Sequence, residues 1–478
     1  MAANGIANGE GAGIPATNLL AAFVADASTS QLTQELRQKV KEVVIDWIGV
    51  TIGALDGAES TKPIYDAILK LQGGDINGKN ACTVLGKGEA RFLPQYAGLL
   101  NATLSHSLDF DDTYIDGTLH SGCTAVSAAL TQAEMKASEV STDQFMLAVA
   151  VGYEITCRIG RELGFEAYHR GFHNTSTAGI FGAVAAITVL RNLPAKTIEM
   201  AWGLAGSKAA GSMQYLDNGS WNKRLHPGFA VHDGFLCVSL AEGGVIGATR
   251  SIEGKNGFLK AYSPNEDKDL TRLTKDLGHK WDWLDNALKP YPACRMTHAL
   301  IELAGNIHTE YAAKHGKAIT PADLDKVILS IPASNFILVG DPTPNKIHPN
   351  NVVDAQFSAY FQVANALLYG SPRGLQGYKR LQEPAIHEVC AKITVLPDEK
   401  VRGFPGRIRL LWENGIEEER YQEFALGEVQ HPFTRPRVEE KYFALVSSTI
   451  GESRAKEILD CIDGLESASV QGLVELLR

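Results

Sequence analysis

The sequence predicts a mainly α-helical protein that carries a smaller α+β region in its C-terminal half. Apolar residues recur at helical spacing through most of residues 18–288, change to strand-like patterns within 326–423, and then return to helical spacing. Helical and mixed segments bury their apolar faces in separate layers. We therefore expect a large all-helical domain built from both chain ends, residues 16–288 and 425–478, and an inserted α+β domain of residues 289–424.

The first helices are predicted from broad apolar faces. Between Leu36 and Leu55, one such face is formed by Val40, Val43, Val44, Trp47, Ile48 and Ile52. The same spacing continues at 145–161 and in the Ala- and Gly-rich segments 178–190 and 198–210. Small residues let neighbouring backbones approach closely, so these segments predict a compact core of nearly all-apolar helices.

Strand-like segments follow Lys289-Pro-Tyr-Pro-Ala-Cys-Arg295, where the composition changes. After one further helix at 297–314, the predicted strands are 326–332, 391–397, 407–412 and 417–423. Glu413-Asn414-Gly415 is the expected hairpin turn between the last two strands. Helical spacing then returns at 439–449, 454–463 and 473–477. We expect these last helices to pack back onto the first ones.

The composition indicates a globular protein without general affinity for polyanions. The chain has 478 residues, of which 45% are hydrophobic and 21% charged, enough for two domains and an ample core. A net charge of -10 argues against binding to nucleic acid or to an anionic membrane, because both attract basic surfaces. No apolar run approaches the roughly 18 to 20 residues of a membrane span.

The N-terminus and the cysteines suggest a cytoplasmic protein. Residues 1–15 begin with a Gly-, Ala- and Asn-rich stretch that lacks the basic start and apolar core of a secretory signal, so we expect a disordered tail. The seven cysteines are odd in number and scattered among apolar neighbours. This pattern is typical of reduced, buried thiols.

The most informative polar cluster runs from His106 to His120. It places Asp109, Asp111 and Asp112 in an otherwise apolar region, where burial is costly unless the groups are used. Imidazole titrates near neutrality and a neighbouring carboxylate fixes its tautomer, so the cluster suits proton transfer beside a substrate carboxylate. The alternative is a solvated junction between helix and loop, with aspartates at N-cap positions.

Two metal hypotheses compete with proton transfer in this cluster. The Asp-x-Asp-Asp pattern of residues 109–112 could hold Mg²⁺ through oxygen ligands, but the sequence lacks a second motif of that kind. Zinc would favour Cys-x-x-Cys or His-Glu-x-x-His spacing, and neither occurs. We therefore expect no metal site.

Further polar groups follow along the chain. His173 precedes an Ala- and Gly-rich helix, whose N-terminal N–H groups attract a carboxylate, although an ordinary capped helix start is the alternative. Lys223, Arg224 and His226 lie in a Gly-punctuated loop and could clamp carboxylates, unless that loop is simply solvated.

Two more candidates lie near or beyond the predicted domain boundary. Arg295 and His298 open a helix at this boundary, and clefts between domains commonly hold small-molecule sites. Tyr360 lies at the start of another apolar helix. We expect it to fill the core rather than to reach the cleft, because its ring is readily buried when the hydroxyl finds a partner.

With these segments in order, the chain resembles the MmgE/PrpD family from about residue 16 to its end. That family includes 2-methylcitrate dehydratases, cis-aconitate decarboxylases and an iminodisuccinate epimerase. The most specific segments are Ser107-Leu-Asp109-Phe-Asp111-Asp112-Thr113, Gly171-Phe172-His173-Asn-Thr-Ser, Trp221-Asn-Lys223-Arg224-Leu-His226-Pro-Gly228 and Lys289-Pro-Tyr-Pro-Ala-Cys-Arg295-Met-Thr-His298.

The resemblance implies an active site between a helical domain and an α+β lid, a homodimer, and no required metal or organic cofactor. The family's pocket residues correspond to Asp109, Thr113, His120, His173, Lys223 and His298. His173 and His120 would act as base and acid in either order, oriented by Asp109. Lys223 and His298 would be the cationic partner and a second proton carrier. Thr113, Arg224 and Arg295 would bind the substrate.

The implied function is that of a cofactor-independent lyase on a di- or tricarboxylate, dehydrating a 2-methylcitrate-like or alkylcitrate-like substrate to an aconitate. A cis-aconitate decarboxylase that forms itaconate is the first alternative. Two departures favour dehydration. Ser121 follows His120 where many members have Pro, and the pocket Tyr of the decarboxylases matches Phe361 or Gln362 better than Tyr360. A catalytically silent carboxylate-binding protein with the same fold is the alternative from another class.

Overall fold

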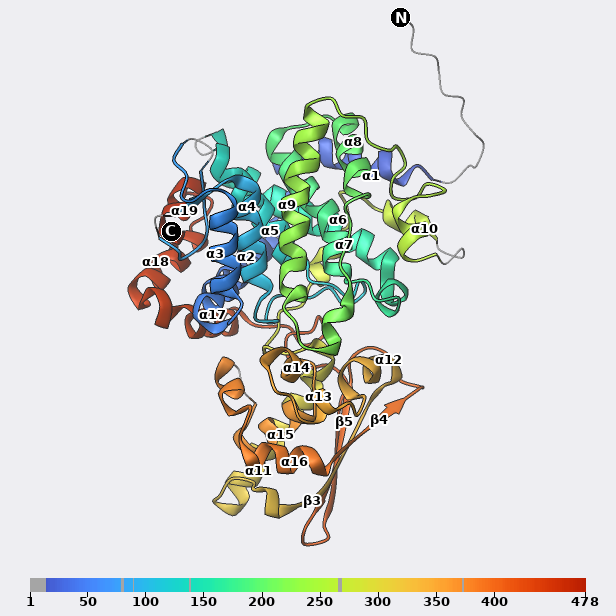
Figure 1. Cartoon of the computed structure of the whole chain (residues 1–478), viewed down its shortest axis with the longest axis vertical. Coiled ribbons are helices and arrows are strands. Elements are labelled where there is room, and N and C mark those ends of the chain that lie inside the picture. Colours follow the sequence, from blue (N-terminus) through green and yellow to red (C-terminus); the bar gives the residue numbers. More distant parts are fainter. Residues whose placement is uncertain (1–13, 79–80, 89, 137–138, 265–268, 372–373) are drawn as a thin grey trace, which may run out of the picture.

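The computed structural model describes residues 14–78, 81–88, 90–136, 139–264, 269–371 and 374–478. Most of these residues form helices, accompanied by a four-stranded sheet and a short two-stranded ladder (Figure 1). The prediction of a mainly α fold is therefore confirmed. The predicted tail, residues 1–15, lies almost wholly outside the described residues.

The N-terminal part of the chain is a bundle of closely packed helices. They are α1 (Ala16–Ala25), α2 (Gln34–Gly57), α3 (Thr61–Leu71), α4 (Pro94–His106), α5 (Gly122–Lys136), α6 (Thr142–His169), α7 (Asn174–Arg191), α8 (Ala195–Ala205), α9 (Asn222–Glu242) and α10 (Phe258–Tyr262). At the centre, α7 packs against α5, α6 and α9. Helices α6 and α7 approach so closely that a Cβ on Gly182 would lie 2.5 Å from the Gly152 carbonyl oxygen. The small residues therefore serve this packing, as predicted.

Helices from the C-terminal end complete the same bundle. They are α17 (Arg435–Ile450), α18 (Glu452–Asp463) and α19 (Val470–Leu477). Helix α17 packs along α2 (Figure 1). The buried apolar side chains of these last helices belong to one cluster with those of the N-terminal helices. The two chain ends therefore share a hydrophobic core, as their apolar periodicity predicts.

This bundle departs from the prediction in two places. Strand β1 (Cys82–Thr83) pairs antiparallel with β2 (Arg91–Phe92), so the predicted all-helical domain is not purely helical. Gly86 and Gly88 adopt positive φ between the two strands, a conformation that glycine permits at little cost. Beyond α9, most of the chain up to residue 288 forms turns and short helices rather than long helices.

The strands of the second part form one mixed sheet. Strands β3 (Leu324–Pro332), β4 (Ile393–Asp398), β5 (Gly406–Trp412) and β6 (Glu417–Gln422) lie in the order β4-β3-β5-β6. The β3–β4 pair is parallel and the other two pairs are antiparallel. All four predicted strands are confirmed. So is the turn before β6, where Gly415 has a φ of 80°.

Helices cover the sheet and form a second hydrophobic core with it. They are α11 (His298–His315), α12 (Ala333–Asn335), α13 (Pro344–Ile347), α14 (Val352–Gln356), α15 (Ala359–Tyr369) and α16 (Pro384–Lys392). Helices α11, α15 and α16 contact β5, β4 and β3, respectively. The second cluster also includes Tyr168, Met213 and Tyr215 from the helical bundle, so the two parts meet there. The predicted domain limits and the closure of a lid stay predictions.

Individual side chains agree with the sequence-based expectations. Tyr360 is buried, and its hydroxyl donates to the Gly340 carbonyl at 2.9 Å, so it fills the core as predicted. Six of the seven cysteines are buried and Cys461 is partly exposed. Among the described residues, we find no helix that is both long enough and apolar enough to cross a membrane.

Lys441 offers a test of the packing between the two chain ends. Its buried ammonium on α17 donates to Asp46 Oδ1 on α2 and to the Phe110 carbonyl, both at 2.6 Å. Lys441→Met would leave the Asp46 carboxylate buried without this partner, so we expect a loss of about 3 to 5 kcal/mol in stability. Thermal unfolding should show a clearly lower midpoint.

Arg437 on the same helix is the matched control. It pairs with Glu440 at the surface, where the two side chains are 42% and 55% exposed. Because solvent screens such a pair, Arg437→Met should change stability by less than about 1 kcal/mol. Equal midpoints for the two variants would show that the buried Lys441 pair does not stabilise the bundle.

Candidate active site

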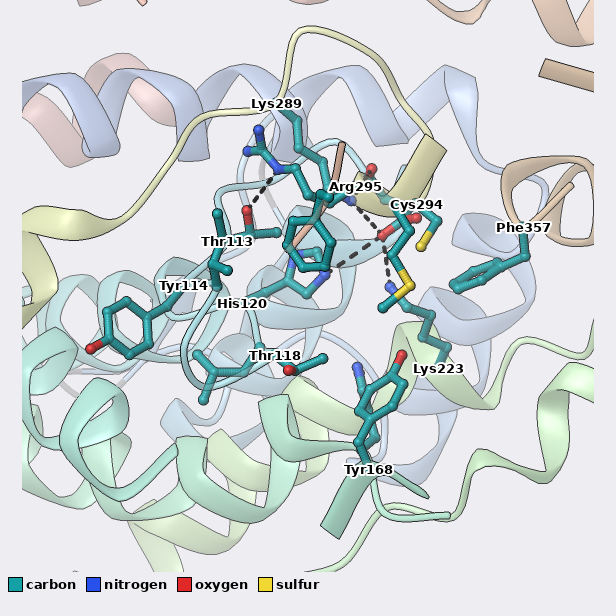
Figure 2. Close-up of a pocket in the computed structure, with 16 residues that line it drawn as sticks. Thr113, Tyr114, Thr118, His120, Tyr168, Lys223, Lys289, Cys294, Arg295 and Phe357 are labelled. Atoms are coloured by element: carbon teal, nitrogen blue, oxygen red, sulfur yellow. Dashed lines mark hydrogen bonds and ion pairs between the residues drawn. The ribbon is translucent and has the colours of Figure 1, made fainter. Parts of the chain in front are cut away.

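A pocket lies where the helical bundle meets the sheet-containing part (Figure 2). The empty space in and around it, open solvent included, is about 470 Å³. Six of the eight predicted site residues line it, namely Asp109, Thr113, His120, His173, Lys223 and Arg295. Phe357 and Phe404 from the sheet-containing part close another side. The structure thus brings together residues from at least five separate chain segments.

Asp109 is the central anion of the pocket. It follows α4 with a φ of 50°, a left-handed conformation that aspartate adopts more readily than most residues. Its Oδ1 accepts hydrogen bonds from Lys223 Nζ at 2.8 Å and from Lys289 Nζ at 2.9 Å. Burial alone would raise the pKa of Asp109, but the two ammonium groups outweigh it and hold this pKa well below its ordinary value. Asp109 is therefore an ionised carboxylate.

The two lysines on Asp109 come from different segments. Lys223 lies in the first turn of α9, and its Nζ also donates to His106 Nε2 at 3.0 Å. Lys289 precedes α11, and its Nζ also donates to the Asp109 carbonyl at 2.8 Å. Burial lowers the pKa of Lys289, although the Asp109 carboxylate opposes this effect. One carboxylate faces two ammonium groups, so one positive charge of this trio is not neutralised and would attract an anion.

His120 lies just before α5 and borders the pocket. Its Nδ1 is 3.1 Å from Asp111 Oδ1, and its Nε2 is 3.7 Å from Asp109 Oδ1. Burial lowers the pKa of His120, and Lys289 and Lys223 add to this effect against the opposing influence of Asp111. The imidazole is therefore neutral at physiological pH.

His173 is the N-cap residue of α7, so its predicted place at a helix start is confirmed. Its Nδ1 lies 3.0 Å from His226 Nδ1, and one of these nitrogens donates to the other. Burial lowers the pKa of His173 well below its ordinary value, and neighbouring cationic groups add to this. Burial also lowers the pKa of His226 to about 4. The pocket thus presents a second neutral imidazole.

Arg295 and Thr113 form a polar pair in the pocket wall. Arg295 Nε donates to Thr113 Oγ1 at 3.1 Å, and its Nη2 donates to the carbonyls of Ala287 and Leu288. Its Nη1 is buried without a hydrogen-bond partner among the described residues. Burial lowers the pKa of Arg295 to about 10, which leaves the guanidinium charged. Among the described residues, this charged group beside the pocket therefore keeps one unsatisfied buried donor.

The other two predicted site residues do not line this pocket. His298 is the first residue of α11, and its Nε2 lies 3.0 Å from the Ala293 carbonyl oxygen. Arg224 donates to Ser60 Oγ at 2.9 Å and pairs with Glu59 at 3.3 Å, beside a different cavity. The roles predicted for His298 and Arg224 stay predictions.

Three residues that contact the predicted ones were not among the predicted site residues, although His106 and His226 belong to the polar segments that the sequence singled out. Lys289 pairs with Asp109, His106 accepts from Lys223, and His226 contacts His173. For Lys289, a signal was available. It is a single cation in the apolar run Ala287-Leu-Lys-Pro-Tyr291, and a lysine in such surroundings is rarely buried without a partner.

Two groups of donor atoms lie close enough together to hold a metal ion. They are Asp109, Asp111 and His120, and His106, Asp111 and Cys123. In the first group, the ammonium groups of Lys223 and Lys289 on Asp109 oppose a cation. In the second, burial raises the pKa of the Cys123 thiol well above its ordinary value, whereas a metal requires the thiolate. Metal independence stays a prediction.

Both parts of the chain match one protein family. Residues 18–271 match the MmgE/PrpD N-terminal domain, and residues 291–467 match the MmgE/PrpD C-terminal domain. A cis-aconitate decarboxylase from Aspergillus terreus is 24% identical over 97% of this chain and 96% of its own length. The human cis-aconitate decarboxylase is 26% identical over 94% of this chain and 92% of its own length.

A third relative, the cis-aconitate decarboxylase-like protein oryM from Aspergillus oryzae, is 24% identical over 95% of each chain. Similarity to these proteins therefore extends through the helical bundle and the sheet-containing part alike. Because the two domain models match both of these parts in order, the chain belongs to the MmgE/PrpD family.

Proposed function

We propose that this protein is a cofactor-independent lyase that acts on a tricarboxylate by proton transfer at a carbon next to a carboxylate. One observation carries the proposal. Among the described residues that line the pocket, Lys223, Lys289 and Arg295 are cations, and Asp109 is the single carboxylate. This imbalance suits a polyanionic ligand, which would supply the missing negative charge.

The two neutral imidazoles favour dehydration as the reaction. A base must remove the proton next to a substrate carboxylate, so that the C–H electrons delocalise into an enediolate. The C–O bond then breaks while an acid protonates the departing hydroxyl, which leaves as water. His173 and His120 are neutral before the reaction and suit the base, whereas the protonated imidazole or a lysine can return the proton. A 2-methylcitrate-like or alkylcitrate-like acid would give an aconitate.

The ammonium groups of the pocket support this chemistry electrostatically. Negative charge develops on the substrate carboxylate as the enediolate forms. Lys223 and Lys289 are held in place by Asp109 before the substrate arrives, so they need little reorganisation during the reaction. Arg295 lines the pocket, so its positive charge would attract one of the other carboxylates.

Decarboxylation of cis-aconitate is the second candidate, and the names of the full-length relatives favour it. In that reaction a C–C bond breaks, CO₂ leaves, and the electron pair left on carbon takes a proton from an acid. The starting state then needs an acid rather than a base, and this pocket would have to use a lysine or a histidine protonated by substrate binding. A silent carboxylate-binding protein is the remaining alternative.

The first test is turnover of three acids. We expect purified protein to consume 2-methylcitrate and release a product with an olefinic carbon, as followed by NMR, whereas a decarboxylase would convert cis-aconitate to itaconate. Citrate serves as the unbranched comparison. The rate should be the same with and without EDTA. Binding of these acids without any turnover would replace the lyase by a carboxylate-binding protein.

The second test concerns Lys223. Lys223→Ala removes an ammonium that would stabilise the enediolate, so kcat should fall at least about a hundredfold. Lys456→Ala, at an exposed position of α18, is the control and should leave kcat unchanged. Near-normal turnover of Lys223→Ala would show that this ammonium does not stabilise the enediolate.

The third test separates the two histidines. His173→Gln preserves bulk but cannot carry a proton, so it should nearly abolish kcat while substrate still binds. We expect a smaller loss for His120→Gln, because His173 is anchored at a helix start.

The base must be neutral, and burial lowers the pKa of His173. In wild type, kcat/KM should therefore fall only below the ordinary histidine pKa of 6.5. If the His173→Gln variant keeps wild-type turnover, His173 is not the proton carrier of the reaction.

A further inference from the structure

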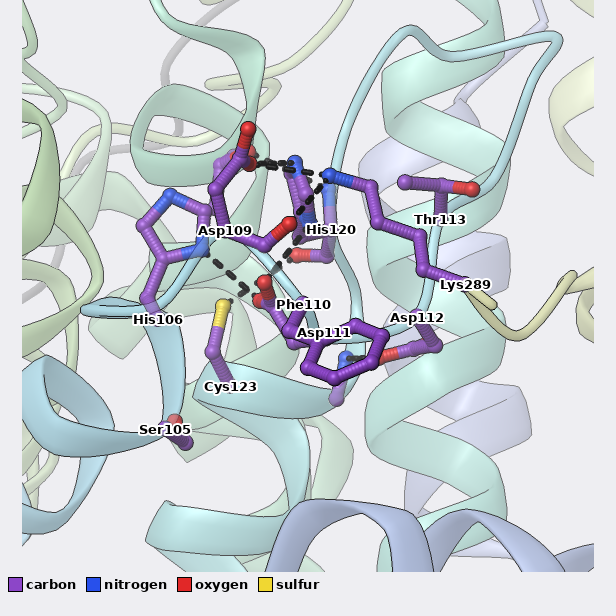
Figure 3. Close-up of polar contacts among 12 residues, drawn as sticks. Ser105, His106, Asp109, Phe110, Asp111, Asp112, Thr113, His120, Cys123 and Lys289 are labelled. Atoms are coloured by element: carbon purple, nitrogen blue, oxygen red, sulfur yellow. Dashed lines mark hydrogen bonds and ion pairs between the residues drawn. The ribbon is translucent and has the colours of Figure 1, made fainter. Parts of the chain in front are cut away.

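Asp111 lies between His106 and His120, of which His120 lines the pocket (Figure 3). Its Oδ2 is 2.7 Å from His106 Nδ1, and its Oδ1 is 3.1 Å from His120 Nδ1. The Asp111 side chain is 2% exposed and does not line the pocket. A group in this place does not reach the substrate, so any effect on catalysis passes through the imidazoles.

We propose that Asp111 is a positioning residue that holds His106 and His120 in the tautomer with hydrogen on Nδ1, and through His106 also orients Lys223. The inference rests on the proposed function, because it assigns the proton state of the same site.

The case for His106 follows from its two contacts. Burial alone would raise the pKa of Asp111, but His106 and His120 outweigh it and hold this pKa well below its ordinary value, so the carboxylate is ionised. An ionised carboxylate only accepts hydrogen bonds, which places the His106 proton on Nδ1. Burial lowers the pKa of His106 to about 3, so the ring is neutral and its Nε2 carries a lone pair. That lone pair accepts from Lys223 Nζ at 3.0 Å.

This arrangement links Asp111 to Asp109 through His106 and Lys223. The other tautomer would direct the His106 Nε2–H at the Lys223 ammonium, so two donors would face each other at 3.0 Å. Lys223 would then lose one of the two contacts that hold it. The carboxylate of Asp111 therefore supports the second of the two hydrogen bonds that hold Lys223 beside Asp109.

His120 contacts Asp111 more loosely: its Nδ1 lies 3.1 Å from Asp111 Oδ1, but neither atom makes a hydrogen bond among the described residues. The negative charge of Asp111 still favours hydrogen on the nitrogen that faces it. With hydrogen on Nδ1 facing Asp111, the Nε2 atom carries the lone pair on the side toward Asp109 in the pocket. Only that tautomer can take up a proton at Nε2. One carboxylate thus prepares a proton acceptor and a cation at the same time.

The first test uses the wild-type protein. In long-range ¹H–¹⁵N spectra of ¹⁵N-histidine-labelled protein, with signals assigned through His106→Gln and His120→Gln, both rings should be neutral with hydrogen on Nδ1. Hydrogen on Nε2 in either ring would overturn the proposal. This measurement needs no substrate, so it stands even if none of the three acids is turned over and the proposed function fails.

The second test uses Asp111→Asn. The amide offers one acceptor and one donor in place of two acceptors, so it cannot accept from both Nδ1–H groups. At least one histidine should therefore change its tautomer, and turnover should fall at least about a hundredfold, the usual size of a lost acid–base contribution. Wild-type tautomers together with wild-type turnover would overturn the proposal.

Asp112→Asn is the matched control. Asp112 is the next residue and equally buried, but its Oδ1 accepts from the Gly122 amide at 3.1 Å instead of contacting an imidazole. Burial and the neighbouring acids raise its pKa to about 8, so at neutral pH it is the uncharged acid that asparagine resembles. Asp112→Asn should keep both tautomers and nearly wild-type turnover. If Asp112→Asn lost as much turnover as Asp111→Asn, both losses would reflect disturbed packing of this segment. That result would overturn the proposal.

Discussion

The pairing of one carboxylate with two ammonium groups is the constraint on which the rest of the site depends. Asp109 follows α4, Lys223 opens α9, and Lys289 precedes α11, so three distant segments meet at one oxygen atom. Each of these charges would be costly to bury alone. The fold at the junction of the two parts is therefore tied to the same contacts that create the positively charged pocket.

Burial favours the uncharged form of each titratable group, and the neighbouring charges decide whether that form prevails. It favours the neutral imidazoles of His120 and His173, and for His120 it outweighs the opposing effect of the nearby Asp111 carboxylate. Asp109 stays ionised because its two lysines outweigh the same burial. One pocket can therefore hold neutral proton acceptors and fixed cations side by side. Both are needed when a proton leaves a carbon next to a carboxylate.

Much of the fold was predictable because it rests on long periodic segments. The buried face of α2 and the four strands of the sheet appear where the apolar spacing predicts them. The ladder of β1 and β2 was missed, since strands of two residues are too short to show alternation. The turns after α9 were missed for a related reason: apolar residues there fill the core from irregular backbone.

Local chemistry determined which segments of the sequence carry the site, and six of the eight predicted side chains do meet in one pocket. The tertiary structure decided the rest. Lys223 and Arg224 are neighbours in one motif, but successive residues on a helix point about 100° apart. Lys223 therefore faces Asp109, whereas Arg224 faces Ser60. Lys289 reaches Asp109 across 180 positions of sequence. Contacts of this kind depend on how the helices pack, and no local pattern of residues encodes that.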